Sequence, residues 1–219
     1  MAEPVDHRQH VFVLPKMFRK VFHGDGEMLG KLCRAASEAT QEFYRVGLGR
    51  DDVSAGIVTT PQLFGDAVNP HCHIHSVVTD EAFDTEGNFH RLLYDAGQDT
   101  LTLTKLFECK VLALLVKEGR LSERMRAEIL RWENTGFSVD ASVRIHKGDR
   151  EGLRRLVRYM ARPAVSVERV SYNGSTGKVI VRSCKKVNGQ RAVKAVIRKR
   201  ASTAQYLTRS FRSRPGTES

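Results

Sequence analysis

The sequence predicts an α+β fold built on a largely antiparallel β-sheet. Stretches typical of strands and stretches with helical apolar spacing are mixed along the 219 residues, without the regular strand–helix–strand order of a parallel α/β fold. Towards the C-terminal end, the pairs Asn173-Gly174 and Asn188-Gly189 separate strand candidates, and Asn-Gly is a strong signal for a hairpin turn. Hairpins join antiparallel neighbours, so both observations favour this class.

The first half of the chain is expected to hold four strands and one helix. Gln9–Leu14 is rich in β-branched and aromatic residues and stops at Pro15, as a strand would. Between Glu27 and Tyr44 the apolar residues follow helical spacing. The remaining strand candidates are 54–64, where Pro61 marks an edge or a break, 71–79, and 89–93, which follows the turn Asp84–Asn88.

The second half is expected to hold three helices and four strands. One helix runs from Leu101 to Gly119, and the next runs from its N-cap Ser122 to about Trp132. Asp149 caps a third helix, which Pro163 terminates. The strand candidates are 136–145, 165–170, 178–184 and 191–197. We therefore expect one folded domain over residues 8–197, followed by a basic, mobile tail over residues 198–219.

The composition is that of a globular protein. Hydrophobic residues make up 41% of the chain, which is enough for a packed core. No apolar run approaches the roughly 20 residues that span a bilayer, and the N-terminus does not read as a secretory signal, so no membrane partner is expected. The four cysteines are scattered and form no CxxC pair, which argues against a zinc knuckle or a disulfide framework. A cytoplasmic location fits these features best.

The positive charge is concentrated in one part of the chain. The formal net charge is +11, and residues 144–214 hold 20 Lys and Arg against 3 Asp and Glu. The remaining residues are acidic on balance. Such asymmetry suggests a polyanionic partner, most simply a nucleic acid. The alternative is a solvated basic surface that binds no partner.

Three histidines occupy alternate positions in a predicted strand. His71, His73 and His75 would project from one face of that strand, since side chains separated by two residues lie on the same side. Imidazole is the commonest side-chain ligand of transition metals, so this pattern predicts half of a metal site. The alternative is a polar sheet face whose histidines form hydrogen bonds.

A predicted helix over residues 150–162 combines an apolar stripe, a basic face and a tyrosine. Leu153, Leu156, Val157 and Met160 follow helical spacing and form the expected buried stripe. Tyr159 falls at the boundary between that stripe and the basic face. The basic residues are Arg154, Arg155, Arg158 and Arg162. The guanidinium groups would bind phosphate oxygens and favour the phenolate, so Tyr159 is a candidate nucleophile for a phosphodiester. The alternative is an ordinary tyrosine at the edge of an amphipathic helix.

The histidines and the tyrosine together predict a metal-dependent nuclease. A divalent cation stabilises charge at phosphorus, and histidines with an oxygen ligand accept Mn²⁺ well and Mg²⁺ more weakly. Besides the strand histidines, the third protein ligand is Gln62, Asp66 or His71, of which we favour Gln62. Attack by Tyr159 would give a covalent phosphotyrosine and a free hydroxyl on the other DNA end.

The ordered set of motifs resembles the HUH endonuclease superfamily and, more closely, the rolling-circle transposases of bacterial insertion sequences. The matching stretches, within about residues 8–185, are 9–16 (QHVFVLPK), 62–65 (QLFG), 69–75 (NPHCHIH), 152–163 (GLRRLVRYMARP) and 167–169 (VER). The resemblance implies that His73 and His75 bind the metal and that Tyr159 is the nucleophile. It also implies a single-stranded DNA substrate and a central antiparallel sheet flanked by helices, so residues 8–197 would form an HUH-type catalytic domain.

The sequence departs from these relatives in three ways. Arg155 stands where some relatives carry a second tyrosine, which makes this chain a one-tyrosine type. The N-terminal cysteine-rich zinc module and the C-terminal continuation of the relatives are not found. A truncated, catalytically inactive DNA-binding remnant is therefore the alternative function. A third alternative is a zinc hydrolase with its histidine pair on a barrel strand. It would need further downstream ligands, for which only His90 and His146 remain, and the chain is short for a (β/α)₈ barrel.

Overall fold

The computed structural model of the chain describes residues 5–64, 70–93, 96–161, 170–176, 178–187 and 190–198. The chain divides into two compact units, the first comprising Met1–Gly65 and Asn69–Arg162 and the second comprising Asp66–Val68 and Pro163–Ser219. The predicted domain of residues 8–197 extends across both units. Apart from Arg198, the predicted tail lies outside the described residues.

The first unit is built on a six-stranded sheet in which each strand pairs with its neighbours antiparallel. The main order is β2-β3-β1-β5, with β4 beside β3 and β6 beside β1. The bounds are β1 (His7–Val13), β2 (Ser54–Phe64), β3 (Pro70–Phe83), β4 (Phe89–Arg91), β5 (Ser138–Asp140) and β6 (Arg144–Ile145). Together with the flanking helices, this sheet confirms the predicted α+β class.

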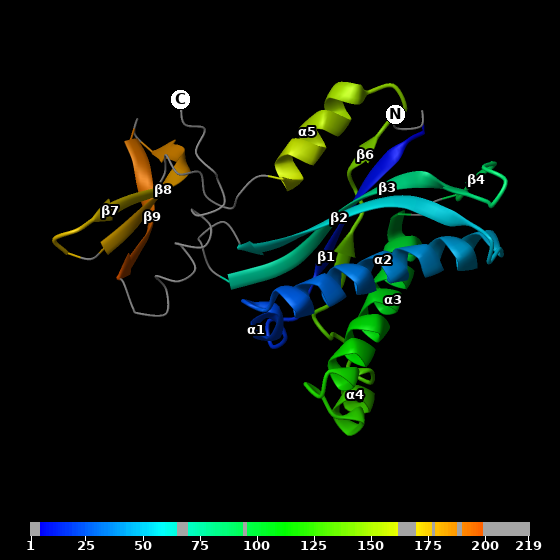
Figure 1. Ribbon diagram of the computed structural model, residues 1–219, viewed down its shortest axis with the longest axis horizontal. Helices are drawn as coiled ribbons and strands as arrows, with labels where there is room; N and C mark the ends of the chain where they lie inside the picture. The colour runs from blue at the N-terminus through cyan, green and yellow to red at the C-terminus, as the bar shows by residue number, and fades with distance from the viewer. Residues whose placement is uncertain are drawn as a thin grey trace, which may run out of the picture. The chain divides into compact units, whose positions relative to one another are not determined.

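The helices of the first unit lie on both faces of this sheet (Figure 1). They are α1 (Arg19–Phe22), α2 (Gly26–Leu48), α3 (Ala96–Lys117), α4 (Glu123–Ile129) and α5 (Arg150–Met160). The predicted caps are present, since the Ser122 side chain accepts a hydrogen bond from the Met125 N–H and the Asp149 side chain accepts one from the Gly152 N–H. No helix among the described residues is long and apolar enough to span a bilayer.

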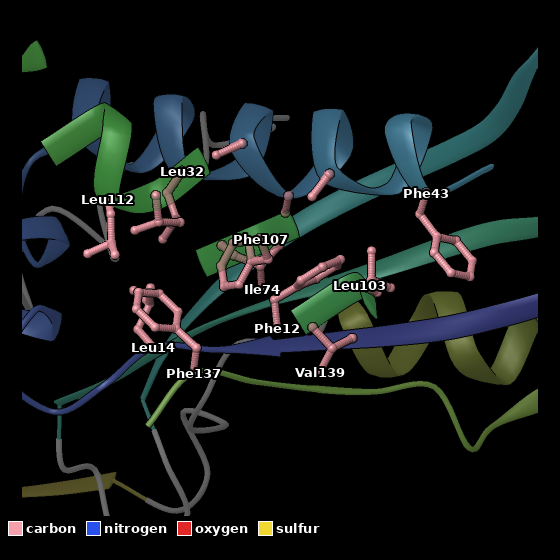
Figure 2. Packing of buried hydrophobic residues seen from close by; sticks show 14 of the residues in the cluster. Phe12, Leu14, Leu32, Phe43, Ile74, Leu103, Phe107, Leu112, Phe137 and Val139 are labelled. Carbon is pink, nitrogen blue, oxygen red and sulfur yellow. The ribbon is translucent and has the colours of Figure 1, made fainter. Parts of the chain in front are cut away.

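The main core fills the space between the sheet and the helices α2 and α3 (Figure 2). Phe12 of β1 and Ile74 of β3 are fully buried there, and the Phe12 ring lies 4.8 Å from the Phe107 ring of α3. Phe107 also contacts the ring of Phe137, centroid to centroid 5.8 Å. The intervening residues of β1 and β3 point away from this core and form the opposite face of the sheet.

The segment predicted as one strand over residues 136–145 is two short strands, β5 and β6. Between them the Asp140 carboxylate accepts a hydrogen bond from the Ser142 N–H, a local turn that takes the backbone out of the ladder. The Arg8 side chain donates to the carbonyl of Ala141, which holds this turn against β1. The prediction of one uninterrupted strand was therefore wrong.

An ion-pair network that is only partly buried fixes the segment that leads into α5. Arg8 and Asp80 form a buried pair at 2.9 Å between β1 and β3. Arg144 of β6 donates to Asp6 at 2.7 Å, and the same carboxylate accepts the backbone N–H of Lys147 at 2.6 Å. That backbone bond and the Arg144 charge lower the pKa of Asp6, so the anchor is charged at neutral pH. The start of α5 is thereby tied to the sheet.

The second unit contains a three-stranded antiparallel sheet in the order β7-β8-β9. Its strands are β7 (Val170–Asn173), β8 (Lys178–Val187) and β9 (Gln190–Arg198). The predicted hairpin at Asn173-Gly174 joins β7 to β8, and the Asn173 side chain accepts a hydrogen bond from the Thr176 N–H. Most of the predicted strand 165–170 and the pair Asn188-Gly189 lie outside the described residues.

Candidate active site

The alternation of β3 separates its apolar residues from its histidines. Cys72 and Ile74 are fully buried on the side of the main core. His71, His73 and His75 occupy the intervening positions, so they lie on the opposite face of the sheet. On that face His75 pairs with Val11 of β1, while His73 pairs with Gln62 of β2. The chain thus presents a ladder of imidazoles beside an amide side chain.

Helix α5 covers part of the same face. Leu156 and Met160 are buried against Val77 of β3 and Ile145 of β6, with Leu153 packed at their margin. Val157, which the sequence places in the buried stripe, is instead 48% exposed. Because the three inward residues centre the contact on one side of the helix, Val157 falls on one flank and Tyr159 on the other.

Tyr159 lies beside the histidine ladder. Its ring centroid is 5.7 Å from that of His75, and the two ring planes are perpendicular. The His75 ring is in turn 4.9 Å from the His73 ring. Half of the Tyr159 side chain is exposed, and no described residue forms a hydrogen bond with its hydroxyl. The phenol is therefore near the imidazoles and open to an incoming group.

Hydrogen bonds orient the His73 ring. Its Nδ1–H donates to the backbone carbonyl of His71 at 2.8 Å, and the Nδ1 of the His71 ring lies 3.1 Å away. Since a neutral imidazole carries one proton, this bond leaves Nε2 of His73 with a free lone pair. That is the tautomer in which a histidine binds a metal through Nε2.

His75 is held between two glutamines on the neighbouring strands. The Gln9 amide of β1 donates to Nδ1 of His75 at 2.8 Å. The ring proton is then on Nε2, which donates to Oε1 of Gln62 on β2 at 3.2 Å. Nε2 of His75 and Oε1 of Gln62 are therefore directed towards each other. A bound cation would take the place of the shared proton between these two atoms.

Burial favours the neutral form of two imidazoles of the ladder, His71 and His75. Burial and, to a smaller extent, the neighbouring His73 lower the pKa of His75 to about 4. The pKa of His71 is also lowered, first by burial and then by the positive charge of Arg19 and by His73. Metal ligation requires the neutral form, so burial favours the state that binds a metal.

The three side chains predicted to bind a metal offer donor atoms that suit a divalent cation, and one of these atoms is an amide oxygen. Among the described residues no group of three or more His, Cys, Asp or Glu side chains is placed to hold a metal ion. The predicted set of His73, His75 and Gln62 uses two imidazole nitrogens and a neutral oxygen, which Mn²⁺ and Mg²⁺ accept together with water. The Nδ1 of His71 lies next to His73, and the other candidate, Asp66, lies outside the described residues.

The predicted basic face of α5 is solvent-exposed. Arg154, Arg155 and Arg158 are all exposed, and none forms an ion pair within the described part of the chain. Arg155 precedes Tyr159 by one helical turn and therefore lies next to it, whereas Arg154 is on the far side of the helix. Arg162 lies outside the described residues. Within the described part of α5, Arg155 is therefore the arginine whose helical position lies nearest to the phenol.

Gln9 is a site residue that the sequence interpretation missed. It belongs to a stretch singled out above, but its contact with His75 joins residues 66 positions apart. The sequence could have indicated this role through the position of Gln9 in β1. Gln9, Val11 and Val13 occupy alternate positions of one strand and so lie on one face, as the three histidines do on theirs. Knowing the pairing of β1 with β3 would have placed Gln9 on the histidine face.

Comparison with known proteins identifies the family. Residues 56–209, more than half of the chain, match the family model described as "Putative transposase". This match covers the histidine ladder, Gln62, the whole of α5 and the second unit up to residue 209. No curated protein matches the chain.

Proposed function

The chain belongs to this transposase family, and we propose that it is an HUH-type, rolling-circle transposase that cuts single-stranded DNA by forming a phosphotyrosine link at Tyr159. One observation carries the proposal. The Tyr159 ring of α5 lies 5.7 Å from the ring of His75, on the sheet face that bears the histidines. The proposed nucleophile therefore lies beside one of the proposed metal ligands, although the two residues are far apart in the sequence.

The proposed metal ligands are Nε2 of His73, Nε2 of His75 and Oε1 of Gln62. The bond from His73 Nδ1 to the His71 carbonyl already leaves Nε2 of His73 without a proton. A bound Mg²⁺ or Mn²⁺ would act as a Lewis acid on a non-bridging phosphate oxygen. The strands β2 and β3 hold the three ligating atoms on a rigid sheet, which favours precise orientation of the phosphate.

The remaining roles fall to α5. Arg155, next to Tyr159, would bind a phosphate oxygen by charge-assisted hydrogen bonds and favour the phenolate. The Tyr159 oxygen would attack phosphorus, losing its proton to solvent, and form a P–O bond. The P–O bond to the leaving deoxyribose oxygen would break, and that oxygen would take up a proton to become a hydroxyl. Arg154, Arg158 and Arg162 would hold phosphates elsewhere along the strand.

A cleavage assay tests this proposal. The purified chain is incubated with a set of single-stranded oligonucleotides from the ends of its own element and with Mn²⁺, and adducts are separated under denaturing conditions. We expect a covalent protein–DNA adduct that disappears in Tyr159→Phe. Tyr172→Phe is the matched control, because Tyr172 is also more than half exposed but belongs to the other unit.

The same assay addresses the alternative function. Retention of the oligonucleotide by the wild-type protein without any adduct would contradict the strand-transfer proposal and support a DNA-binding remnant. An adduct that persists in Tyr159→Phe would contradict the assignment of the nucleophile. Equal cutting of duplex DNA would contradict the single-stranded substrate.

A further inference from the structure

Gln9 is a buried polar residue at the edge of the proposed site. Only 7% of its surface is exposed, and its amide lies 2.8 Å from Nδ1 of His75. It is too far back to bind the same cation as His75, since it contacts the ring nitrogen on the opposite side from Gln62. Any influence on the site must therefore act through the imidazole of His75.

The present hydrogen bonds fix His75 in the tautomer that does not bind a metal through Nε2. The Gln9 amide donates to Nδ1, so the single ring proton is on Nε2 and faces Gln62. For Nε2 to become a ligand, the proton has to move to Nδ1. The new Nδ1–H then needs an acceptor in a buried position, because an unpaired buried donor costs about 1–3 kcal/mol.

We propose that Gln9 is a positioning residue that sets the tautomer of His75 by rotating its amide. This inference rests on the proposed function, since it concerns the same metal site. With the NH₂ group towards His75, Gln9 stabilises the metal-free tautomer. After rotation of the amide by half a turn, Oε1 occupies the same place and accepts the Nδ1–H bond that the ligating tautomer requires.

A glutamine is suited to this role because it offers a donor and an acceptor of equal reach without carrying charge. The proton passes from Nε2 to Nδ1 of one ring through solvent, so no net proton is released at His75. His73 needs no such device, since the His71 carbonyl already accepts its Nδ1–H bond. The two proposed imidazole ligands are therefore oriented differently, one by a fixed acceptor and the other by a reversible one.

The experiment compares Gln9→Met, which keeps the side-chain volume but removes both hydrogen-bonding groups, with Gln9→Glu, which can only accept from Nδ1. Gln41→Met is the matched control, because the Gln41 amide is likewise held by hydrogen bonds, in its case two to the backbone of Ala55, away from the histidines. The first readout is the ¹⁵N spectrum of the histidine side chains in the metal-free proteins. The second is the Mn²⁺ affinity by titration calorimetry.

We expect His75 to carry its proton on Nε2 in the metal-free wild type and on Nδ1 in Gln9→Glu. We expect Gln9→Met to bind Mn²⁺ about 10–100-fold more weakly than wild type, with Gln9→Glu at or above wild-type affinity and Gln41→Met unchanged. An Nε2–H tautomer in Gln9→Glu, or wild-type affinity in Gln9→Met, would overturn the proposal. A wild-type protein that bound no Mn²⁺ would instead overturn the metal site, and the metal-free spectra would still decide the role of Gln9.

Discussion

The two faces of the six-stranded sheet are built from the same strands but differ in chemistry. On the face covered by α2 and α3, large apolar side chains such as Phe12 and Ile74 are fully buried. On the other face, α5 covers only part of the sheet, and the positions between the apolar residues of β3 are histidines. One face holds the main core and the other carries the proposed site, so substitutions on the two faces should have separable effects.

The largest effect is expected from removing an imidazole on the histidine face. His73→Ala or His75→Ala should reduce Mn²⁺-dependent cutting to background, because each removes a proposed ligand, while most DNA binding remains. Adduct formation and retention on single-stranded DNA are measured in parallel. Unchanged cutting in both variants would contradict the proposal that the histidine face binds the catalytic metal.

The converse effect is expected on the core face. Phe107→Ala should lower the free energy of unfolding by about 3–5 kcal/mol, because it leaves a cavity beside Phe12 and Phe137. Urea titration measures this loss, and the Mn²⁺ affinity of the protein that remains folded should equal that of wild type. A large loss of affinity without loss of stability would show that the two faces are not independent.

A smaller effect should distinguish the arginines of α5 from one another. Arg155→Gln should slow adduct formation by roughly 10- to 150-fold, the equivalent of one charged hydrogen bond worth about 1.5–3 kcal/mol. Arg154→Gln, on the far side of the helix from Tyr159, should weaken DNA binding slightly and leave the rate at saturating DNA unchanged. Single-turnover kinetics separate these two outcomes, and equal rates for both variants would contradict a special role for Arg155.

The smallest effect concerns a buried histidine on the core face. Burial lowers the pKa of His10 to about 3, and neither ring nitrogen has a hydrogen-bond partner among the described residues. The folded state favours neutral His10. Protonation of this histidine therefore does not reduce the free energy of unfolding above about pH 6.5, and it lowers that free energy progressively as the pH falls from 6.5 towards 3. Below pH 6 we expect His10→Leu to reduce the pH dependence of the unfolding free energy by up to about 1.4 kcal/mol per pH unit. An unchanged slope would mean that His10 is protonated without cost.

Local signals predicted much of this arrangement. The bounds of β2 follow from its β-branched residues, and those of α5 follow from Asp149 as N-cap and the spacing of Leu153, Leu156 and Met160. The face on which the histidines lie follows from the period of a strand. These features depend on residues close together in the sequence, so the sequence alone was sufficient.

Other features depend on contacts between distant residues and were not predicted. Val157 is exposed because Val77 and Ile145 contact only one side of α5. The sequence of the helix does not reveal which side these distant residues will contact. The turn at Asp140 separates β5 from β6, although the alternating residues of this segment predict one continuous strand. The contact of Gln9 with His75 depends on the register between β1 and β3, which is fixed by the whole sheet.

We propose above all that the histidine pair holds the metal that contacts the DNA phosphate. The most direct test is electron–nuclear double resonance of Mn²⁺ bound to Tyr159→Phe together with a single-stranded oligonucleotide, so that the DNA stays uncut. We predict ¹⁴N couplings from two imidazoles, which diminish but persist through His73 in the double variant with His75→Ala, and a ³¹P coupling from a phosphate on the same ion. A ³¹P coupling without ¹⁴N couplings, or ¹⁴N couplings that are undiminished by the loss of His75, would contradict this assignment.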